Sequence, residues 1–140
     1  GPGQHPEKLI PLIIKNIVAQ KSLPIYGQGE NIRDWLYVED HVEAIDLILH
    51  KGNLGETYAL GANNEKKNLD LVHYLIEKVD QRLDRSTGSS IKLIEFVDDR
   101  LGHDYRYAID TSKIKKEIGW KASTSFDEGI EQTLEFYLAI

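Results

Sequence analysis

The stretch IRDWLYVEDH, residues 32–41, decides the fold class because its character changes halfway along. Its first part, Ile32 to Val38, is rich in aromatic and β-branched residues and predicts a strand, with Arg33, Trp35 and Tyr37 on one face. The acidic pair after it suits the first turn of a helix, where negative charge is stabilised. Apolar residues then recur at three- and four-residue spacing as far as Leu49. A strand followed at once by an amphipathic helix is typical of an α/β protein.

The segment before this stretch predicts one helix and one short extended piece. The sequence from His5 to Glu7 has the proline and the acid expected at a helix start, and the apolar periodicity ends near Gln20. Leu23 to Tyr26 predicts an extended segment, and Gly27 to Gly29 predicts a turn.

The segment after this stretch predicts two further strands and three helices. The predicted strands are Glu56 to Leu60 and Ile91 to Val97. The predicted helices run from Asn68 to about Leu83, from about Thr111 to Ile118 and from about Phe126 to Ala139. The segments 61–67, 84–90 and 98–107 are predicted to be loops. Asn68 and Ser125 are the expected N-caps. Few strands thus accompany many amphipathic helices, each of which must bury an apolar stripe. We therefore expect part of a larger α/β fold.

Composition limits the function. The chain has 140 residues, no cysteine, and 17 basic against 23 acidic side chains, for a formal net charge of -6. The acidic balance disfavours a nucleic-acid partner. No apolar run is long enough to span a membrane, so we expect a soluble, cytoplasmic protein. The chain has no methionine, and its start at Gly1-Pro2 fits a tag remnant, an internal segment of a longer gene product, or native sequence.

Three places suit an anionic ligand. The loop Asp99 to Asp104, with Arg106 after it, offers guanidinium groups, an imidazole and a glycine that permits close approach of the backbone. Arg33 is a charge inside a β-prone run, and Tyr26 precedes a glycine turn, where its ring suits a base or a ribose. From the residues alone, each place also has a purely structural explanation. The loop can be solvated with internal ion pairs, Arg33 can form a salt bridge on the strand, and Tyr26 can be a half-buried core residue.

The sequence lacks the motifs that are typical of metal binding, dinucleotide binding and nucleophilic catalysis. The five histidines show no metal-ligand spacing. Gly27-Gln28-Gly29 lacks the third glycine of a dinucleotide-binding turn, and neither a P-loop nor a nucleophile elbow is present. We therefore assign no metal site and no cofactor-binding motif.

Several motifs resemble a known family. They are PEKLIP at 6–11, LPIYG at 23–27, RDWLYVEDH at 33–41, NEKKN at 64–68, the loop 99–110 and IGW at 118–120. In this order they resemble the C-terminal part of the nucleotide-sugar dehydratases and epimerases, which are extended short-chain dehydrogenase/reductases. The first and fourth motifs point most narrowly to the dTDP-glucose 4,6-dehydratases. The resemblance covers residues 1 to about 138.

This resemblance implies a lyase that acts on dTDP-glucose and yields dTDP-4-keto-6-deoxyglucose by oxidation, loss of water and reduction, a step of nucleotide-sugar metabolism such as dTDP-rhamnose biosynthesis. It implies an N-terminal Rossmann domain that binds NAD and carries the catalytic residues, so none of these is expected within residues 1–140, and the chain alone is expected to be inactive. Some elements within about residues 30–60 are expected to pack on that missing domain. The full-length enzyme is expected to be a homodimer.

The resemblance also implies which residues bind the substrate. They are Lys8, Leu9, Pro24, Ile25, Tyr26, Arg33, Asn68, Asp99, Arg100, Leu101, Gly102 and His103. Arg33 and Arg100 match the diphosphate-binding arginines, and Tyr26 lies at the nucleoside end. Leu101 replaces the family's usual proline, so the loop loses a restraint on φ. The alternatives are another nucleotide-sugar epimerase, decarboxylase or dehydratase, and a non-catalytic nucleotide-sugar-binding module.

Overall fold

Short strands pair two by two in this protein, and helices form most of its core. The computed structural model describes residues 1–139. The elements are α1 (Leu9–Val18), β1 (Leu23–Tyr26), β2 (Ile32–Asp34), α2 (Val38–Lys51), β3 (Glu65–Lys67), α3 (Asn68–Arg82), the 3-10 helix η1 (Ser89–Leu93), β4 (Ile94–Val97), α4 (Ser112–Glu117) and α5 (Phe126–Tyr137). The predicted α/β composition is confirmed.

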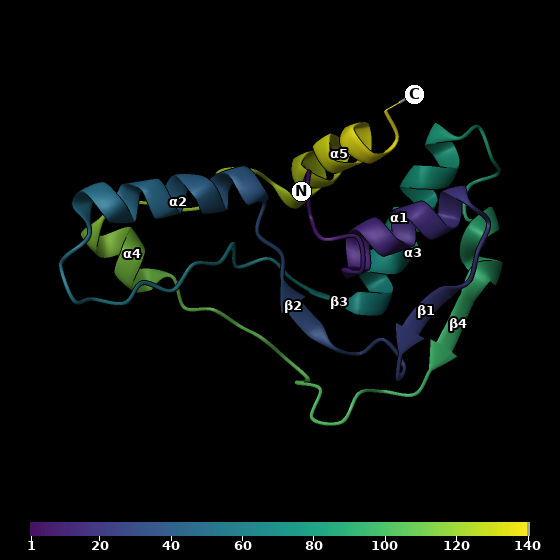
Figure 1. Ribbon diagram of the computed structural model, residues 1–140, viewed down its shortest axis with the longest axis horizontal. Helices are drawn as coiled ribbons and strands as arrows, with labels where there is room; N and C mark the ends of the chain where they lie inside the picture. The colour runs from purple at the N-terminus through teal and green to yellow at the C-terminus, as the bar shows by residue number, and fades with distance from the viewer. Residues whose placement is uncertain (140) are drawn as a thin grey trace.

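The two strand pairs have opposite polarity. β1 pairs parallel with β4, with Leu23 opposite Ile94, whereas β2 pairs antiparallel with β3, with Ile32 opposite Lys67. In Figure 1 the segment after β4 runs along the lower edge of the molecule, past both strand pairs, before it reaches α4. Parallel strands end at the same edge, so the segments after β1 and β4 begin side by side.

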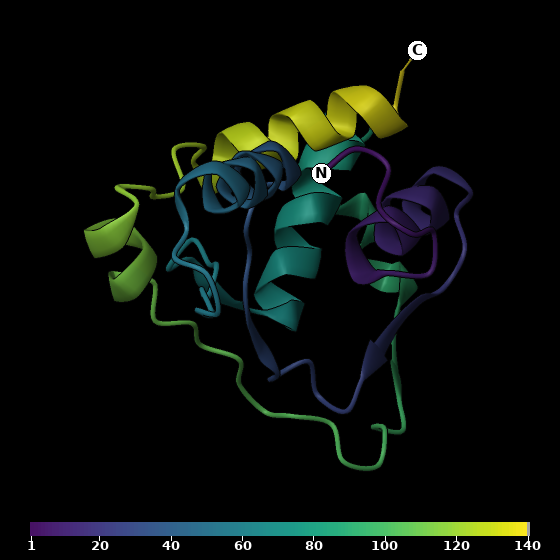
Figure 2. The same cartoon turned by 60° about the vertical axis from the view of Figure 1, so that its left-hand side comes forward.

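The apolar core has two parts. The larger lies among α1, α3, α5 and β1, where Ile13, Leu75 and Leu134 are fully buried. In Figure 2, α5 crosses the top of this part with α3 below it. The smaller part joins α2 to α4 through Ala44 and Ile114. α2 and α4 therefore form a lobe at one end of the molecule, as Figure 1 shows.

The first helix begins later than its sequence predicts. His5 to Lys8 form a turn, in which the Lys8 N–H donates to the His5 carbonyl (2.9 Å), and α1 begins at Leu9. A helix that included Glu7 would bring its carbonyl against the ring of Pro11. Starting at Leu9 places Pro11 in the first turn, where a missing N–H costs nothing.

The strand predicted from Ile32 to Val38 is wrong beyond Asp34. Its partner β3 has only three residues, and the Asp34 carboxylate accepts the next backbone N–H groups of the partner segment, from Ala62 (2.9 Å) and Asn64 (2.7 Å). These bonds end the ladder, and α2 begins at Val38.

Two further expectations from the sequence are corrected. The predicted strand from Glu56 to Leu60 has no regular structure. Instead, β3 forms within the predicted loop 61–67, because this segment pairs with β2 even though it lacks apolar alternation. Of the predicted strand Ile91 to Val97 only β4 forms, since its partner β1 has four residues. Asn68 is the first residue of α3 and Lys67 holds the N-cap position, so the predicted cap is wrong.

The closing helices agree with their predictions within one or two residues at each end. Ser125 caps α5 as predicted: its hydroxyl accepts the Glu128 N–H, and the Glu128 carboxylate accepts the Ser125 N–H. Within residues 1–139 no helix has the length and the apolar character needed to cross a membrane.

Candidate functional site

An open cleft of about 810 Å³ lies where the chain's N-terminal segment, the end of β1, β2 and the segment after β4 meet. Its lining residues are Gln4, His5, Glu7, Lys8, Leu9, Leu12, Pro24, Ile25, Tyr26, Arg33, Trp35, Asn68, Arg100 and His103. Five of them can carry positive charge and only Glu7 is acidic. This cleft therefore suits an anion although the chain as a whole is acidic.

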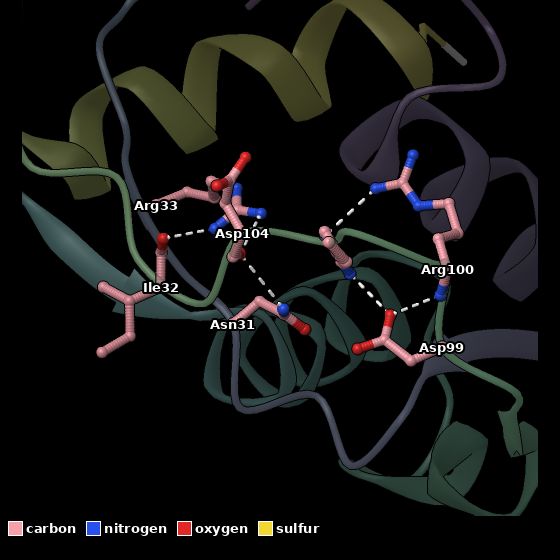
Figure 3. Close-up of polar contacts among 7 residues, drawn as sticks. Asn31, Ile32, Arg33, Asp99, Arg100 and Asp104 are labelled. Carbon is pink, nitrogen blue, oxygen red and sulfur yellow. Dashed lines mark hydrogen bonds and ion pairs between the residues drawn. The ribbon is translucent and has the colours of Figure 1, made fainter.

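Arg100 reaches the cleft from the loop that follows β4. The Asp99 carboxylate accepts the Arg100 backbone N–H (2.8 Å) and lies 2.6 Å from Nδ1 of His103, as Figure 3 shows for Asp99 and Arg100. The hydrogen bond with His103 holds the pKa of Asp99 below its ordinary value. The Arg100 guanidinium lies over the Tyr26 ring, 5.0 Å from its centroid. The loop thus pairs internally and still presents a cation to the cleft.

Arg33 reaches the cleft from β2. The Ile32 N–H donates to the Tyr105 carbonyl (2.7 Å), which brings the segment after β4 alongside this strand. Arg33 Nη2 then donates to the Asp104 carbonyl (2.8 Å), as Figure 3 shows. The guanidinium lies 4.5 Å from the centroid of the Tyr107 ring. These contacts hold Arg33 in place and leave several of its five N–H donors free.

Three polar atoms among the cleft residues are buried and have no hydrogen-bond partner within residues 1–139. They are Oε1 of Gln4, Nε1 of Trp35 and Oδ1 of Asn68. A buried polar atom without a partner costs about 1–3 kcal/mol, so such atoms are uncommon in native proteins. Asn68 lines this cleft, whereas Gln4 and Trp35 line both this cleft and a second pocket beside α5.

Most residues singled out in the sequence lie in this cleft. The exceptions are Asp99, which lies behind His103, and Leu101 and Gly102, which do not line it; Leu101 is fully exposed. Arg106 also lies outside, where Nε and Nη2 bind both carboxylate oxygens of Glu65 (2.5 and 2.7 Å). This pair holds the pKa of Glu65 below its ordinary value.

Sequence reasoning missed several residues of the cleft. They are Gln4, His5, Glu7, Leu12 and Trp35. Strand alternation already put Trp35 on the same face as Arg33, which is a signal that could have found it. Gln4 gave no such signal, because its place depends on a tertiary contact in which the Tyr137 hydroxyl donates to the Gln4 carbonyl (3.1 Å).

The described residues do not form a metal centre or a dinucleotide-binding turn. Across residues 1–139, no group of three or more His, Asp or Glu side chains is placed to hold a metal ion. The turn at Gly27 to Gly29 leads into β2 and not into a helix, so it lacks the strand–turn–helix geometry that binds a dinucleotide.

The α/β fold with this cation-lined cleft corresponds to a known family of enzymes. Residues 1–133 match the family model described as GDP-mannose 4,6 dehydratase. Because the match spans nearly the whole sequence, this chain belongs to that family of nucleotide-sugar dehydratases.

Within the family, the chain is similar to dTDP-glucose 4,6-dehydratases. It is 52% identical over 139 residues to the Salmonella typhimurium enzyme, with 99% of this chain and 38% of the enzyme covered. It is 48% identical to the Xanthomonas campestris enzyme, again over 99% of this chain and 40% of the enzyme. The chain thus spans about two fifths of the length of these relatives, and the predicted resemblance to their C-terminal part is confirmed.

Solved structures agree with this assignment. A Bacillus anthracis dTDP-glucose 4,6-dehydratase in complex with NAD has a TM-score of 0.85 and 46% identity, covering 99% of this chain and 42% of that chain. The Streptomyces venezuelae dTDP-glucose 4,6-dehydratase with NAD and TYD bound has a TM-score of 0.88 and 38% identity, covering 99% and 41%. A UDP-glucuronic acid 4-epimerase from Bacillus cereus, 22% identical with a TM-score of 0.83, shares the fold.

Proposed function

We propose that this chain is the nucleotide-sugar-binding C-terminal part of a dTDP-glucose 4,6-dehydratase. The observation that supports it most is the cleft, where Lys8, Arg33 and Arg100 come together from three separate segments. Such a grouping suits a ligand with several negative charges, and a guanidinium offers paired donors that match a phosphate.

In this proposal the diphosphate of the nucleotide sugar lies between Arg33 and Arg100. Arg33 uses Nη1 for the Ile32 carbonyl (2.7 Å) and Nη2 for Asp104, so Nε–H and one hydrogen on each terminal nitrogen remain for a ligand. Tyr26 is 44% exposed at the end of β1, where its ring can contact the nucleoside.

The unpartnered polar atoms fit the rest of a nucleotide sugar. Gln4 Oε1 and Asn68 Oδ1 accept hydrogen bonds, and Trp35 Nε1 donates one. Hydroxyl groups of a sugar or ribose both donate and accept, so their chemistry matches all three atoms. Substrate-binding roles follow for Lys8, Leu9, Pro24, Ile25, Tyr26, Arg33, Asn68 and Arg100. His103 lines the cleft beside Arg100, and Asp99, Leu101 and Gly102 contribute by shaping the loop.

The whole protein then converts dTDP-glucose to dTDP-4-keto-6-deoxyglucose. Bound NAD supplies reversible hydride transfer in this reaction, and we infer that it binds outside the part of the enzyme that this chain represents. This chain orients the substrate through its diphosphate and lacks the proton-transfer residues, so we expect no dehydratase activity from it alone. A homodimeric, cytoplasmic enzyme follows from the resemblance.

We further propose that residues of about 30–60 pack on that NAD-binding part. The support is a stripe of exposed apolar side chains along α2, where Val42 is 60%, Ile45 53% and Leu49 79% exposed. Residues at this spacing share one helix face, and a soluble domain normally buries such a face.

A titration followed by amide NMR tests the proposed ligand. We expect dTDP to shift the amide signals of Tyr26, Arg33 and Arg100, since these residues line the cleft. The labelled 140-residue chain carries Ile45→Glu and Leu49→Glu for this titration, because these substitutions lie on α2 outside the cleft and place charge on its exposed apolar stripe. GDP is the parallel titration, because the matching family model is described as GDP-mannose 4,6 dehydratase. Stronger shifts with GDP favour a GDP-sugar dehydratase instead.

The titration needs a control for nonspecific anion binding. Inorganic phosphate at the same charge concentration and the variant Arg106→Ala serve here, because Arg106 pairs with Glu65 outside the cleft. A well-dispersed spectrum that responds to neither nucleotide contradicts the proposed ligand.

A further inference from the structure

The hydrogen-bond geometry of Asp99, Arg100 and His103 is consistent with one arrangement of protons. Arg100 Nη2 lies 3.0 Å from His103 Nε2, and His103 Nδ1 lies 2.6 Å from Asp99 Oδ1. An arginine side chain only donates hydrogen bonds, and an ionised carboxylate only accepts them. Nε2 of His103 must therefore accept from Arg100, and Nδ1 must donate to Asp99. His103 is a neutral imidazole with its proton on Nδ1.

This arrangement is held tightly by its surroundings. The His103 side chain is only 7% exposed, and its ring meets the Tyr26 ring edge-on at 6.2 Å between centroids. The His103 backbone N–H donates to the Arg100 carbonyl (3.1 Å), which closes the turn. A Cβ at Gly27 would lie 3.4 Å from Asp99 Oδ2, so the carboxylate also packs closely on the turn after β1.

We propose that Asp99 and His103 are positioning residues for Arg100. This inference rests on the proposed function, in which Arg100 binds the diphosphate. Asp99 fixes the tautomer of His103, and His103 then holds one N–H of Arg100 so that the guanidinium stays over Tyr26 and faces the cleft. The remaining N–H groups of Arg100 are left for the ligand. A pre-positioned arginine loses less side-chain freedom when an anion binds.

The alternative is that His103 contacts the ligand directly, since its side chain also lines the cleft. The two assignments differ in one respect. A direct contact contributes to binding whether or not Arg100 is present, whereas a positioning residue contributes only through Arg100. A double-mutant cycle separates the two.

The first test needs no ligand. Long-range ¹⁵N–¹H correlation spectra at pH 8.5 report which imidazole nitrogen carries the proton. We expect the Nδ1–H tautomer for His103, a change to Nε2–H in Asp99→Ala, and no change at the exposed His41 in that variant. An Nε2–H tautomer for His103 in the unaltered chain overturns the proposal.

The second test measures dTDP affinity by calorimetry. We expect His103→Leu to weaken binding about 5- to 10-fold, because the acceptor for Arg100 is lost. His103→Gln, whose carbonyl oxygen replaces that acceptor, should retain most of the affinity. In the Arg100→Ala background, His103→Leu should cause no further loss.

The outcomes are distinguishable. Equal losses from His103→Leu in both backgrounds make His103 a direct contact and overturn the proposal. Failure of His103→Gln to restore affinity, with a native-like amide spectrum, does the same. If the Nδ1–H tautomer is present and dTDP does not bind, the proposed function fails and the arrangement of the cluster stands.

Discussion

Arg33 and Arg100 are far apart in the sequence and lie at one cleft, so each can be tested for binding of a shared anion. We expect Arg33→Ala and Arg100→Ala each to weaken dTDP binding in the full-length enzyme by about 1.5–3 kcal/mol, as for the loss of charge-assisted hydrogen bonds. Calorimetry with dTDP measures this.

Arg106→Ala is the matched control for both variants. It removes the same charge from the same region, yet Arg106 pairs with Glu65 away from the cleft. Its effect on dTDP binding should be much smaller. Equal effects of all three substitutions would mean that net charge and not the cleft governs binding, and unchanged binding in Arg33→Ala and Arg100→Ala would remove the diphosphate assignment.

Asp40 connects α2 to the segment before α5. Burial by itself raises the pKa of Asp40, but hydrogen bonds from the Thr124 N–H (3.0 Å) and the Ser123 hydroxyl (2.9 Å) outweigh it and leave the pKa below the ordinary 3.8. A depressed pKa in the folded state stabilises the protein above the ordinary value, and this stability is lost as the pH falls through the lower folded pKa.

We therefore expect Asp40→Ala to reduce the free energy of unfolding by about 1.5–3 kcal/mol at pH 7, since two hydrogen bonds to a charged group disappear. The difference from the unaltered chain should narrow as the pH is lowered from 5 to 2. Urea unfolding across this range measures it, and a difference that stays constant with pH would contradict the role of the ionised carboxylate.

At the residue scale, the sequence predicted charged groups better than neutral ones. Arg33 and Arg100 are visible in a sequence because a charge in a β-prone run or a glycine loop needs an explanation. Gln4 and Trp35 carry no charge. Strand alternation places Trp35 on the face of Arg33, but the burial of its Nε1 and of Gln4 Oε1 without a hydrogen-bond partner is determined only by the fold.

At the element scale, α5 depends on its N-terminal capping box. Ser125 and Glu128 satisfy each other's backbone N–H groups, and the helix buries Ile130 and Leu134 in the larger core. We expect Ser125→Ala to lower the free energy of unfolding by about 1 kcal/mol, within a range of about 0.5–2. Thermal unfolding followed by circular dichroism tests this.

Ser86→Ala is a suitable comparison for the cap, because Ser86 lies outside the helices, in the segment between α3 and η1. Its substitution should change the melting temperature less than Ser125→Ala does. If the two variants melt alike, the capping box does not contribute as its geometry indicates.

Helices and strands were not equally predictable from this sequence. The apolar periodicity of α3, from Leu69 to Leu83, is a local property, so the helix was predicted at almost its full length. β3 consists of Glu65 to Lys67 and has no apolar alternation; it forms only because β2 lies beside it. Short strands are defined by their partners, and one sequence segment does not contain that information.

At the scale of the whole molecule, the exposed apolar stripe of α2 has a consequence for the isolated chain. Val38, Val42, Ile45 and Leu49 follow one another along a single helix face and are 37–79% exposed. If the rest of the enzyme normally covers this face, the chain without it exposes a patch of the kind that drives association.

We expect the 140-residue chain to self-associate at micromolar concentrations, with a sedimentation coefficient that rises with concentration. The double variant Ile45→Glu/Leu49→Glu should reduce this association because it places charge on the stripe. Leu54→Glu is the matched control, since Leu54 is an exposed leucine that lies after the helix. A chain that sediments as a monomer at all concentrations and melts sharply and reversibly would contradict this prediction, because such behaviour requires no partner for α2. It would then favour the alternative of a binding module that is stable without the NAD-binding part.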